Sequence, residues 1–276
     1  MKKSRQSTER GRRTRGRRAD GPESLSFDLA VGLEGRAALV TGGGTGIGRA
    51  ISLALGRAGA SVAVNYHSKR KPAEAVAGEI RAYGADAIVV RADVSSPLGA
   101  ARAVGMAAGR FGRLDILVNN VGDFLHKPLL DVTPEEWEAI VRNNLDSAFY
   151  CSLQAIPHMR KRGWGRIVNL GVAGCDGIRA FPNTTAYNVA KTGVLILAKS
   201  LAKEVAPFGI TVNAVAPGLI DTGAMARRMM KKFEASVPML RAGTPGEVAE
   251  VVLFLVGERT SYITGACVSV SGGWLV

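Results

Sequence analysis

Residues 37–56 read AALVTGGGTGIGRAISLALG, which is an apolar strand, a glycine-rich turn and the start of an amphipathic helix. Glycines in this turn would let a pyrophosphate approach the backbone, and the helix that follows would present free N–H groups and a partial positive charge. The stretch lacks a Gly-Lys-Ser/Thr ending, which excludes a nucleotide-hydrolysing P-loop. We therefore predict a dinucleotide-binding turn; the alternative is a tight turn without a ligand.

Short apolar strands and helices alternate along the rest of the chain. This alternation predicts right-handed crossovers and a parallel sheet covered on both faces. We predict an α/β fold, a doubly wound, Rossmann-like parallel sheet that forms a single domain over residues 33–276. The predicted strands span 37–40, 61–66, 86–90, 114–119, 166–170, 210–215 and 267–270, and the predicted helices span 46–58, 72–83, 96–111, 134–161, 185–206 and 245–256.

The composition indicates a folded chain with a basic extension. Hydrophobic residues make up 47% of the 276 residues, which is enough for a sizeable core, and no apolar run is long enough for a membrane span. The net charge of +13 is concentrated in residues 1–18, which hold nine Lys or Arg residues against Glu9. We expect residues 1–30 to be a disordered basic tail. The tail could bind nucleic acid or an acidic membrane weakly, but a solvated extension is the favoured interpretation, and we expect no nucleic-acid partner.

The three cysteines, Cys151, Cys175 and Cys267, are widely spaced, and the histidines are isolated. This pattern argues against a disulfide framework and a zinc site, so we expect no metal. It favours a reducing, cytoplasmic compartment. Each thiol is interpreted as core filling rather than as a nucleophile.

The strand at 61–66 ends in the sequence NYHS (residues 65–68), and three cations follow at 69–71. An acidic residue here would bind both ribose hydroxyls and repel a 2′-phosphate, so its absence favours NADP(H) over NAD(H). The alternative is a solvated basic loop. Two further strands end in groups that suit a dinucleotide, namely Asp93 for the adenine amino group and the stretch 119–122 for the nicotinamide ribose.

Tyr187 and Lys191 lie four residues apart in a predicted helix, and therefore on one face. A tyrosine with its ordinary pKa near ~10 is a poor acid or base at neutral pH. We expect the ammonium of Lys191 to favour the phenolate and lower the pKa of Tyr187, so that Tyr187 could exchange a proton with a carbonyl or alcohol oxygen. A Tyr-xxx-Lys pair alone is weak evidence.

Taken together, the motifs resemble the short-chain dehydrogenase/reductase family over all but the first thirty or so residues. They are the turn at 41–48, Asp93, the stretch 119–122, the Tyr187/Lys191 pair and Pro217-Gly218, in this order. Within the family, ITVNAVAPG at 210–218 and the endings YITG at 262–265 and SGG at 271–273 are most similar to 3-oxoacyl-[acyl-carrier-protein] reductases.

The resemblance implies roles for individual residues. Tyr187, Lys191 and Asn144 would be catalytic, with Asn144 anchoring a water that relays protons to Lys191; the alternative for Asn144 is a helix-bending core amide. The expected dinucleotide-binding residues are Thr41, Gly42, Gly44, Thr45, Gly46, Ile47, Gly48, Asn65, Tyr66, His67, Ser68, Asp93, Val94, Asn120, Val121, Gly122, Tyr187, Lys191, Pro217, Gly218, Ile220 and Thr222.

One position departs from the family pattern. A serine normally follows the fifth strand and hydrogen-bonds the substrate carbonyl, but this chain has Gly171 there and no serine between residues 152 and 200. Losing one such donor costs on the order of 10²–10³ in rate. Thr184, Thr185, Asp176 or a backbone N–H could replace it, and the sequence does not decide among them.

We expect an NADP(H)-dependent reductase that turns the ketone of a 3-oxoacyl thioester, or of a related small carbonyl, into an alcohol. The alternative, motivated by the missing serine, is a dinucleotide-binding sensor or scaffold with weak or no catalysis. The segment 224–240 is rich in Met and basic residues. It could be a lid over an apolar substrate or an ordinary amphipathic helix, and its cations could meet an acyl carrier protein. The resemblance also implies a homotetramer assembled through the helices at 134–161 and 185–206 and the C-terminal strand.

Overall fold

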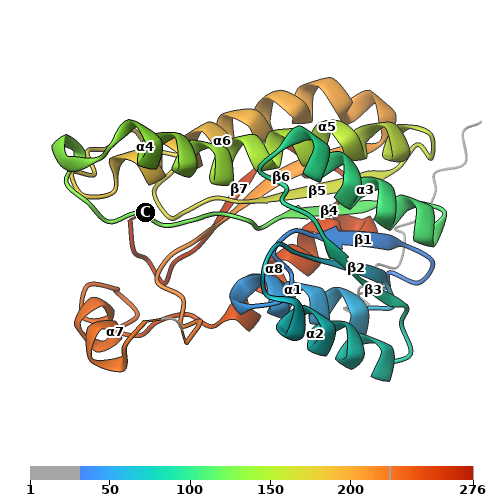
Figure 1. Cartoon of the computed structure of the whole chain (residues 1–276), viewed down its shortest axis with the longest axis horizontal. Coiled ribbons are helices and arrows are strands. Elements are labelled where there is room, and N and C mark those ends of the chain that lie inside the picture. The colour runs from blue at the N-terminus through green and yellow to red at the C-terminus, as the bar shows by residue number, and fades with distance from the viewer. Residues whose placement is uncertain (1–31, 224, 276) are drawn as a thin grey trace, which may run out of the picture. The chain divides into compact units, whose positions relative to one another are not determined.

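The computed structural model describes residues 32–223 and 225–275. Its seven strands form one parallel sheet in the order β3-β2-β1-β4-β5-β6-β7 (Figure 1), which confirms the predicted doubly wound fold. The predicted basic tail, residues 1–30, lies outside the described residues. The strands are β1 (Ala37–Val40), β2 (Ser61–Tyr66), β3 (Ala87–Arg91), β4 (Ile116–Asn119), β5 (Gly165–Leu170), β6 (Ile210–Pro217) and β7 (Cys267–Val270).

Helices cover both faces of the sheet. Each layer packs against one face of the same central strands, because alternate apolar side chains of β1, β2, β4, β5 and β6 point to opposite faces (Figure 1). The first layer is α1 (Gly46–Arg57), α2 (Arg70–Ala82) and α8 (Pro245–Val256), and the second is α3 (Pro97–Phe111), α5 (Ser147–Arg160) and α6 (Thr185–Val205). Because the chain turns back from β3 to β4 on the other side of β1, the ends of β1 and β4 form the switch point where such folds bind ligands.

Local sequence signals set several helix ends. Ser96 caps α3 by accepting a hydrogen bond from the N–H of Gly99, and Gly112 ends that helix in the left-handed conformation, with φ 69°. Capping boxes begin α8, with Thr244 and Glu247, and the short α4 (Pro134–Val141). These signals lie within a few residues of each helix end, which is why the sequence could locate the ends closely.

The helix expected over 134–161 is interrupted. Between α4 and α5 the chain makes a π-helical turn over Arg142–Asp146, the kind of bulge that is frequent at functional sites. The segment after β6 contains α7 (Arg227–Glu234), which lies apart from the layer formed by α1, α2 and α8 (Figure 1). Among the described residues, we find no helix with the length and apolar character that a membrane span requires.

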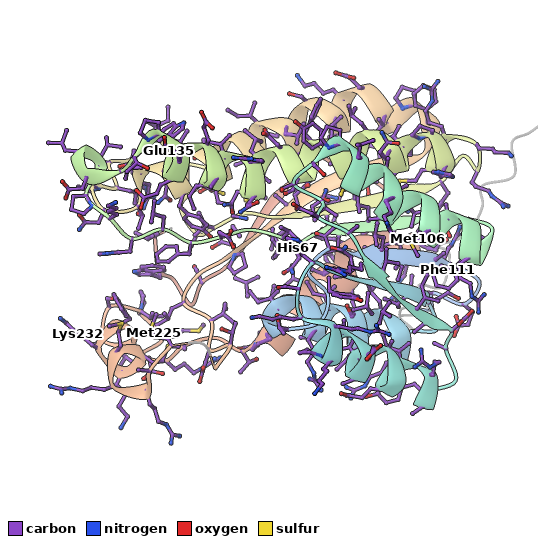
Figure 2. All side chains as sticks on the ribbon, viewed as in Figure 1. His67, Met106, Phe111, Glu135, Met225 and Lys232 are labelled. Atoms are coloured by element: carbon purple, nitrogen blue, oxygen red, sulfur yellow. The ribbon has the colours of Figure 1, made fainter. Side chains whose placement is uncertain are left out.

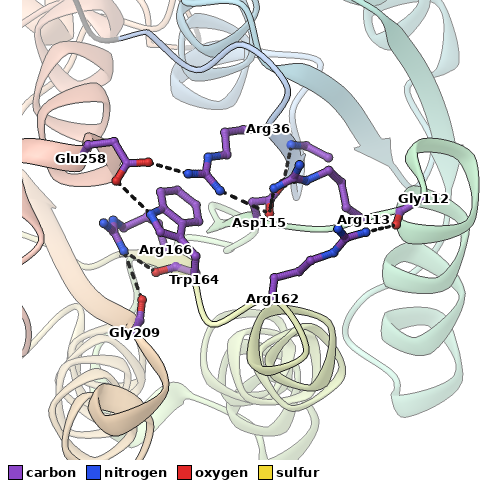
Figure 3. Close-up of polar contacts among 11 residues, drawn as sticks. Arg36, Gly112, Arg113, Asp115, Arg162, Trp164, Arg166, Gly209 and Glu258 are labelled. Atoms are coloured by element: carbon purple, nitrogen blue, oxygen red, sulfur yellow. Dashed lines mark hydrogen bonds and ion pairs between the residues drawn. The ribbon is translucent and has the colours of Figure 1, made fainter.

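A polar network braces the amino-terminal end of the sheet (Figure 3). The fully buried carboxylate of Asp115 accepts hydrogen bonds from the backbone N–H of Ala37 and from Arg113, at 2.8 and 2.6 Å. Nearby, the guanidinium groups of Arg36 and Arg166 both stack on the ring of Trp164, 3.8 and 4.2 Å from its centroid. This network lies at the amino-terminal ends of the strands, whereas the candidate site lies at their carboxyl ends, so we assign the network to stability.

Candidate functional site

The glycine-rich turn has a backbone that a ligand could approach closely. Gly42 and Gly46 have positive φ, at 60° and 54°, where other residues are strained. A Cβ on Gly48 would stand 2.3 Å from the carbonyl oxygen of Gly42, so no side chain fits there. Thr45 precedes α1 but makes no side-chain cap, which leaves the first N–H groups of the helix available to an anion. The turn therefore fits a pyrophosphate.

Two predicted cofactor residues hold this turn with their side chains. The hydroxyl of Thr41 accepts hydrogen bonds from the N–H groups of Asn120 and Val121, at 2.9 and 3.1 Å. The amide oxygen of Asn65 accepts one from the N–H of Gly42 at 3.2 Å. Both Thr41 and Asn65 are buried, so their side chains position the turn rather than reach outward.

The predicted adenine end of the site lies by a hollow beyond β2 and β3. This cavity has a volume of about 380 Å³, and His67, labelled in Figure 2, is one of the residues that line it. The pKa of Asp93 is lowered, chiefly because the hydroxyl of Ser95 donates a hydrogen bond to its carboxylate at 2.7 Å. The sequence analysis named His67 and Asp93 but not the exposed Arg91 and Arg102, and Arg102 on α3 carried no sequence signal. The cavity is lined by His67, Arg91, Ala92, Asp93, Leu98, Gly99 and Arg102.

The loop after β6 returns over the glycine turn. A Cβ on Gly46 would lie 3.4 Å from the methyl carbon of Thr222, and Ile220 pairs with Gly243 in a parallel bridge. Gly218 allows β6 and β7 to approach closely at their ends, since its Cβ would lie 2.8 Å from the Cα of Ser271. These contacts place the predicted nicotinamide residues next to the predicted pyrophosphate turn.

Tyr187 and Lys191 meet near the amino-terminal end of α6. The ammonium nitrogen of Lys191 lies 5.8 Å from the centroid of the Tyr187 ring and donates a 2.7 Å hydrogen bond to the carbonyl of Leu170 at the end of β5. Burial lowers the pKa of Lys191 to about 8 and raises the pKa of Tyr187 to about 12. The expectation that Lys191 lowers the pKa of Tyr187 is therefore wrong for this structure, because burial raises that pKa and the charge on Cys175 adds to the rise.

Asn144 lies buried in the π-helical turn with one polar atom unpaired. Its amide nitrogen donates to the carbonyls of Ile140 and Asp123, both at 2.9 Å, while no described residue donates to its oxygen. That oxygen and the Lys191 nitrogen converge on Gly122, where a Cβ would lie 2.4 Å from the first atom and 3.1 Å from the second. A buried acceptor beside a buried ammonium fits a bridging water.

Of the expected replacement donors for the missing serine, Thr185 already donates elsewhere and Asp176 is exposed, whereas the hydroxyl of Thr184 only accepts among the described residues and keeps its own O–H for a substrate. The hydroxyl of Thr184 accepts a hydrogen bond from Asn188, at 2.8 Å, and that of Thr185 donates to the carbonyl of Phe181, also at 2.8 Å. Asp176 is exposed. The space beside Gly171 is taken by the sulfur of Cys175, which lies 3.1 Å from the position a Cβ would occupy.

An aromatic side chain that sequence reasoning missed lies against Tyr187. Phe124 meets the Tyr187 ring edge to face, with centroids 5.1 Å apart and planes at 82°. Phe124 is nevertheless 65% exposed, so most of its apolar surface faces outward. Its only sequence signal was its place two residues after Gly122.

Comparisons with known proteins agree with this geometry. A family model described as enoyl-(acyl carrier protein) reductase matches residues 42–275. The 3-oxoacyl-[acyl-carrier-protein] reductase FabG of Staphylococcus aureus is 38% identical over 242 residues, which cover 86% of this chain and 97% of that protein.

Solved structures are similar over nearly the same span. One described as a putative short-chain alcohol dehydrogenase from Sinorhizobium meliloti has a TM-score of 0.83 and 35% identity, covering 88% of this chain and 98% of that one. The acetoin dehydrogenase YohF of Salmonella typhimurium has a TM-score of 0.80 and 35% identity, covering 87% and 97%. The chain belongs to the short-chain dehydrogenase/reductase family, a class of oxidoreductases.

Proposed function

We propose that the protein is an NADP(H)-dependent reductase that converts the ketone of a 3-oxoacyl thioester, or of a related small carbonyl, into an alcohol. The observation that carries the proposal is the convergence of Lys191 and the unpaired oxygen of Asn144 on Gly122, beside Tyr187. A sensor or scaffold would have no need for this arrangement. The relatives named as 3-oxoacyl-[acyl-carrier-protein] reductases support the substrate class.

The bound dinucleotide would supply the hydride, while the chain's own residues would handle the proton. With a pKa of about 12, Tyr187 stays protonated at neutral pH and can give its proton to the carbonyl oxygen of the substrate. Lys191, held by the Leu170 carbonyl, would steady the charge that develops on the tyrosine oxygen. A water on the Asn144 oxygen would return a proton toward Lys191.

The preference for NADP(H) over NAD(H) rests on charge. The end of β2 carries no acid, and the cations at 69–71 are exposed, as are Arg91 and Arg102 at the cavity beyond β3. A 2′-phosphate in this region would meet positive charge rather than a carboxylate.

We propose two kinds of partner, an acyl carrier protein and further copies of this chain, and features of the described surface support both. Four exposed cations on α7, among them Lys232 (Figure 2), suit an acidic carrier protein that delivers an acyl thioester. Exposed apolar side chains on α5 and α6, such as Leu153 at 45% and Ile196 at 62%, support assembly into a homotetramer through these helices.

The test follows NADPH and NADH oxidation at about 340 nm, where the reduced nicotinamide absorbs. The substrates are a short 3-oxoacyl thioester and acetoin, and Tyr187→Phe is the control. Turnover that is faster with NADPH and lost in the variant supports the proposal. Tight NADPH binding with no turnover on either substrate would favour the sensor alternative, provided that Tyr187→Phe leaves the NADPH binding unchanged.

A further inference from the structure

Two cysteines from distant parts of the chain meet beside the catalytic pair. Cys175 follows β5, and Cys267 begins β7 and pairs in register with Ala214 on β6. Both belong to one small apolar cluster with Ala214 and Ala216. Because these two β6 residues carry only methyl groups, no bulky side chain separates Cys175 from Cys267 within this cluster.

The position of Cys175 is tied to the missing serine. Its sulfur lies 3.1 Å from the point where a Cβ on Gly171 would stand, so a side chain at residue 171 would crowd it. Cys175 is only 2% exposed and faces the sheet, so it does not replace the serine as a donor to substrate. Its sulfur nevertheless lies beside Gly171, and the carbonyl of the preceding residue, Leu170, is the one that holds Lys191.

The surroundings of the pair favour a reactive thiolate on one sulfur. The hydrogen bond from Cys267 lowers the pKa of Cys175 to about 7, with further help from the Val172 N–H and from Lys191, while burial and Asp176 oppose this shift. The same hydrogen bond raises the pKa of Cys267. Thiolates are the nucleophiles of disulfide chemistry. By contrast, burial alone raises the pKa of Cys151 to about 12.

We propose that Cys175 and Cys267 are an oxidisable dithiol whose closure to a disulfide inhibits the adjacent catalytic pair. With hydrogen peroxide as the oxidant, the S–S bond forms as the O–O bond breaks. The two thiols give up two electrons and two protons, and the peroxide becomes two waters. Cys267 is only half-buried, which gives a small oxidant access to the pair.

Closure would act on Lys191 in two ways. The anion on Cys175 raises the pKa of Lys191, and closure removes that anion. The pKa of Lys191 therefore falls, and the buried ammonium loses its proton more readily. Closure also brings the two sulfurs to about 2 Å from each other, pulling the segment after Leu170 toward β7. The oxidised protein should lose activity, and a reductant should restore it.

The experiment treats the full-length protein with hydrogen peroxide and counts free thiols after unfolding, with peptide mass spectrometry to locate any cross-link. We expect the three free thiols to fall to one, with a link between the peptides of residues 175 and 267. Phenylarsine oxide, which bridges neighbouring thiols, should protect both cysteines from alkylation in the untreated protein. Cys151→Ser is the matched control and should still form the link.

Activity is read in parallel, as NADPH oxidation before peroxide, after it and after dithiothreitol. Wild type and Cys151→Ser should lose activity and regain it, whereas Cys267→Ser should keep its activity under the same dose. Separate oxidation of each thiol without a cross-link would overturn the proposal, as would reversible inactivation of Cys267→Ser equal to that of wild type. The activity arm rests on the proposed reductase function, but the thiol count and the cross-link do not, so the two proposals fail independently.

Discussion

Replacing Gly122 by alanine tests the geometry of the proton path directly. The new methyl group would stand 2.4 Å from the Asn144 oxygen, about 1 Å inside an ordinary contact of 3.4 Å or more. Asn144 cannot move away cheaply, since its nitrogen is held by the carbonyls of Ile140 and Asp123. The added group must therefore displace the Asn144 oxygen, the Lys191 nitrogen or both.

The size of the effect follows from this displacement. A misplacement of about 1 Å near the reacting groups can cost roughly 100-fold in rate, so we expect kcat of Gly122→Ala to fall by about that factor. Overpacking should lower the free energy of unfolding by about 1–3 kcal/mol.

The assay compares steady-state NADPH oxidation and urea unfolding of Gly122→Ala with those of Gly105→Ala. Gly105 lies within α3, where an added Cβ meets nothing within 4 Å, so this control should keep its activity and gain up to about 1 kcal/mol of stability. If kcat of Gly122→Ala stays within about threefold of wild type, far less than a 1 Å displacement predicts, then the convergence of Asn144 and Lys191 has no catalytic meaning.

Reductase activity should fall as the pH rises above about 8, because the buried Lys191 loses its proton there. A kcat–pH profile of Lys191→Arg should lack this alkaline fall, since arginine keeps its proton. Over the same range stability should rise with pH, since an unfolded lysine keeps its proton up to about 10.4, and urea unfolding at several pH values measures this. Phe124→Ala should raise KM for long 3-oxoacyl chains more than for short ones, since it removes an exposed apolar wall beside Tyr187; equal effects on both would contradict that role. Asp115→Ala should lower the free energy of unfolding by about 3–5 kcal/mol in urea titrations, because it removes a buried carboxylate that binds the partly buried Arg113 and the Ala37 N–H. Asp86→Ala, at an exposed pair, should cost less than about 1 kcal/mol.

The sheet and the glycine turn could be predicted because their signals are local. Strand and helix ends fall within about two residues of the expected ones wherever caps, glycines or apolar runs mark them. The π-helical turn at Arg142–Asp146 could not be predicted in this way, since apolar periodicity continues through it. Its place depends on the hydrogen bond from Asn144 to the carbonyl of Asp123, in a different part of the chain.

In the candidate site too, local sequence patterns predicted some features, whereas others depend on tertiary contacts. Residue types and spacing along one helix were enough to select Tyr187 and Lys191, because side chains four positions apart share a helical face. Which way a buried polar side chain turns depends on the partners that folding brings to it. Asn65 was expected at the dinucleotide, but its amide lies under the glycine turn because that turn and the end of β3 supply its hydrogen-bond partners.

The order of residues is thus enough to predict the fold class and the family and to select Tyr187 and Lys191 as a candidate catalytic pair, because each of these rests on local motifs and their spacing. Folding decides the rest. The pKa values of Tyr187 and Lys191 come from burial, which no local pattern reveals. The meeting of Cys175 with Cys267 depends on the register of β6 and β7 and on the small side chains between them. Desolvation and long-range packing exist only once distant segments share one core.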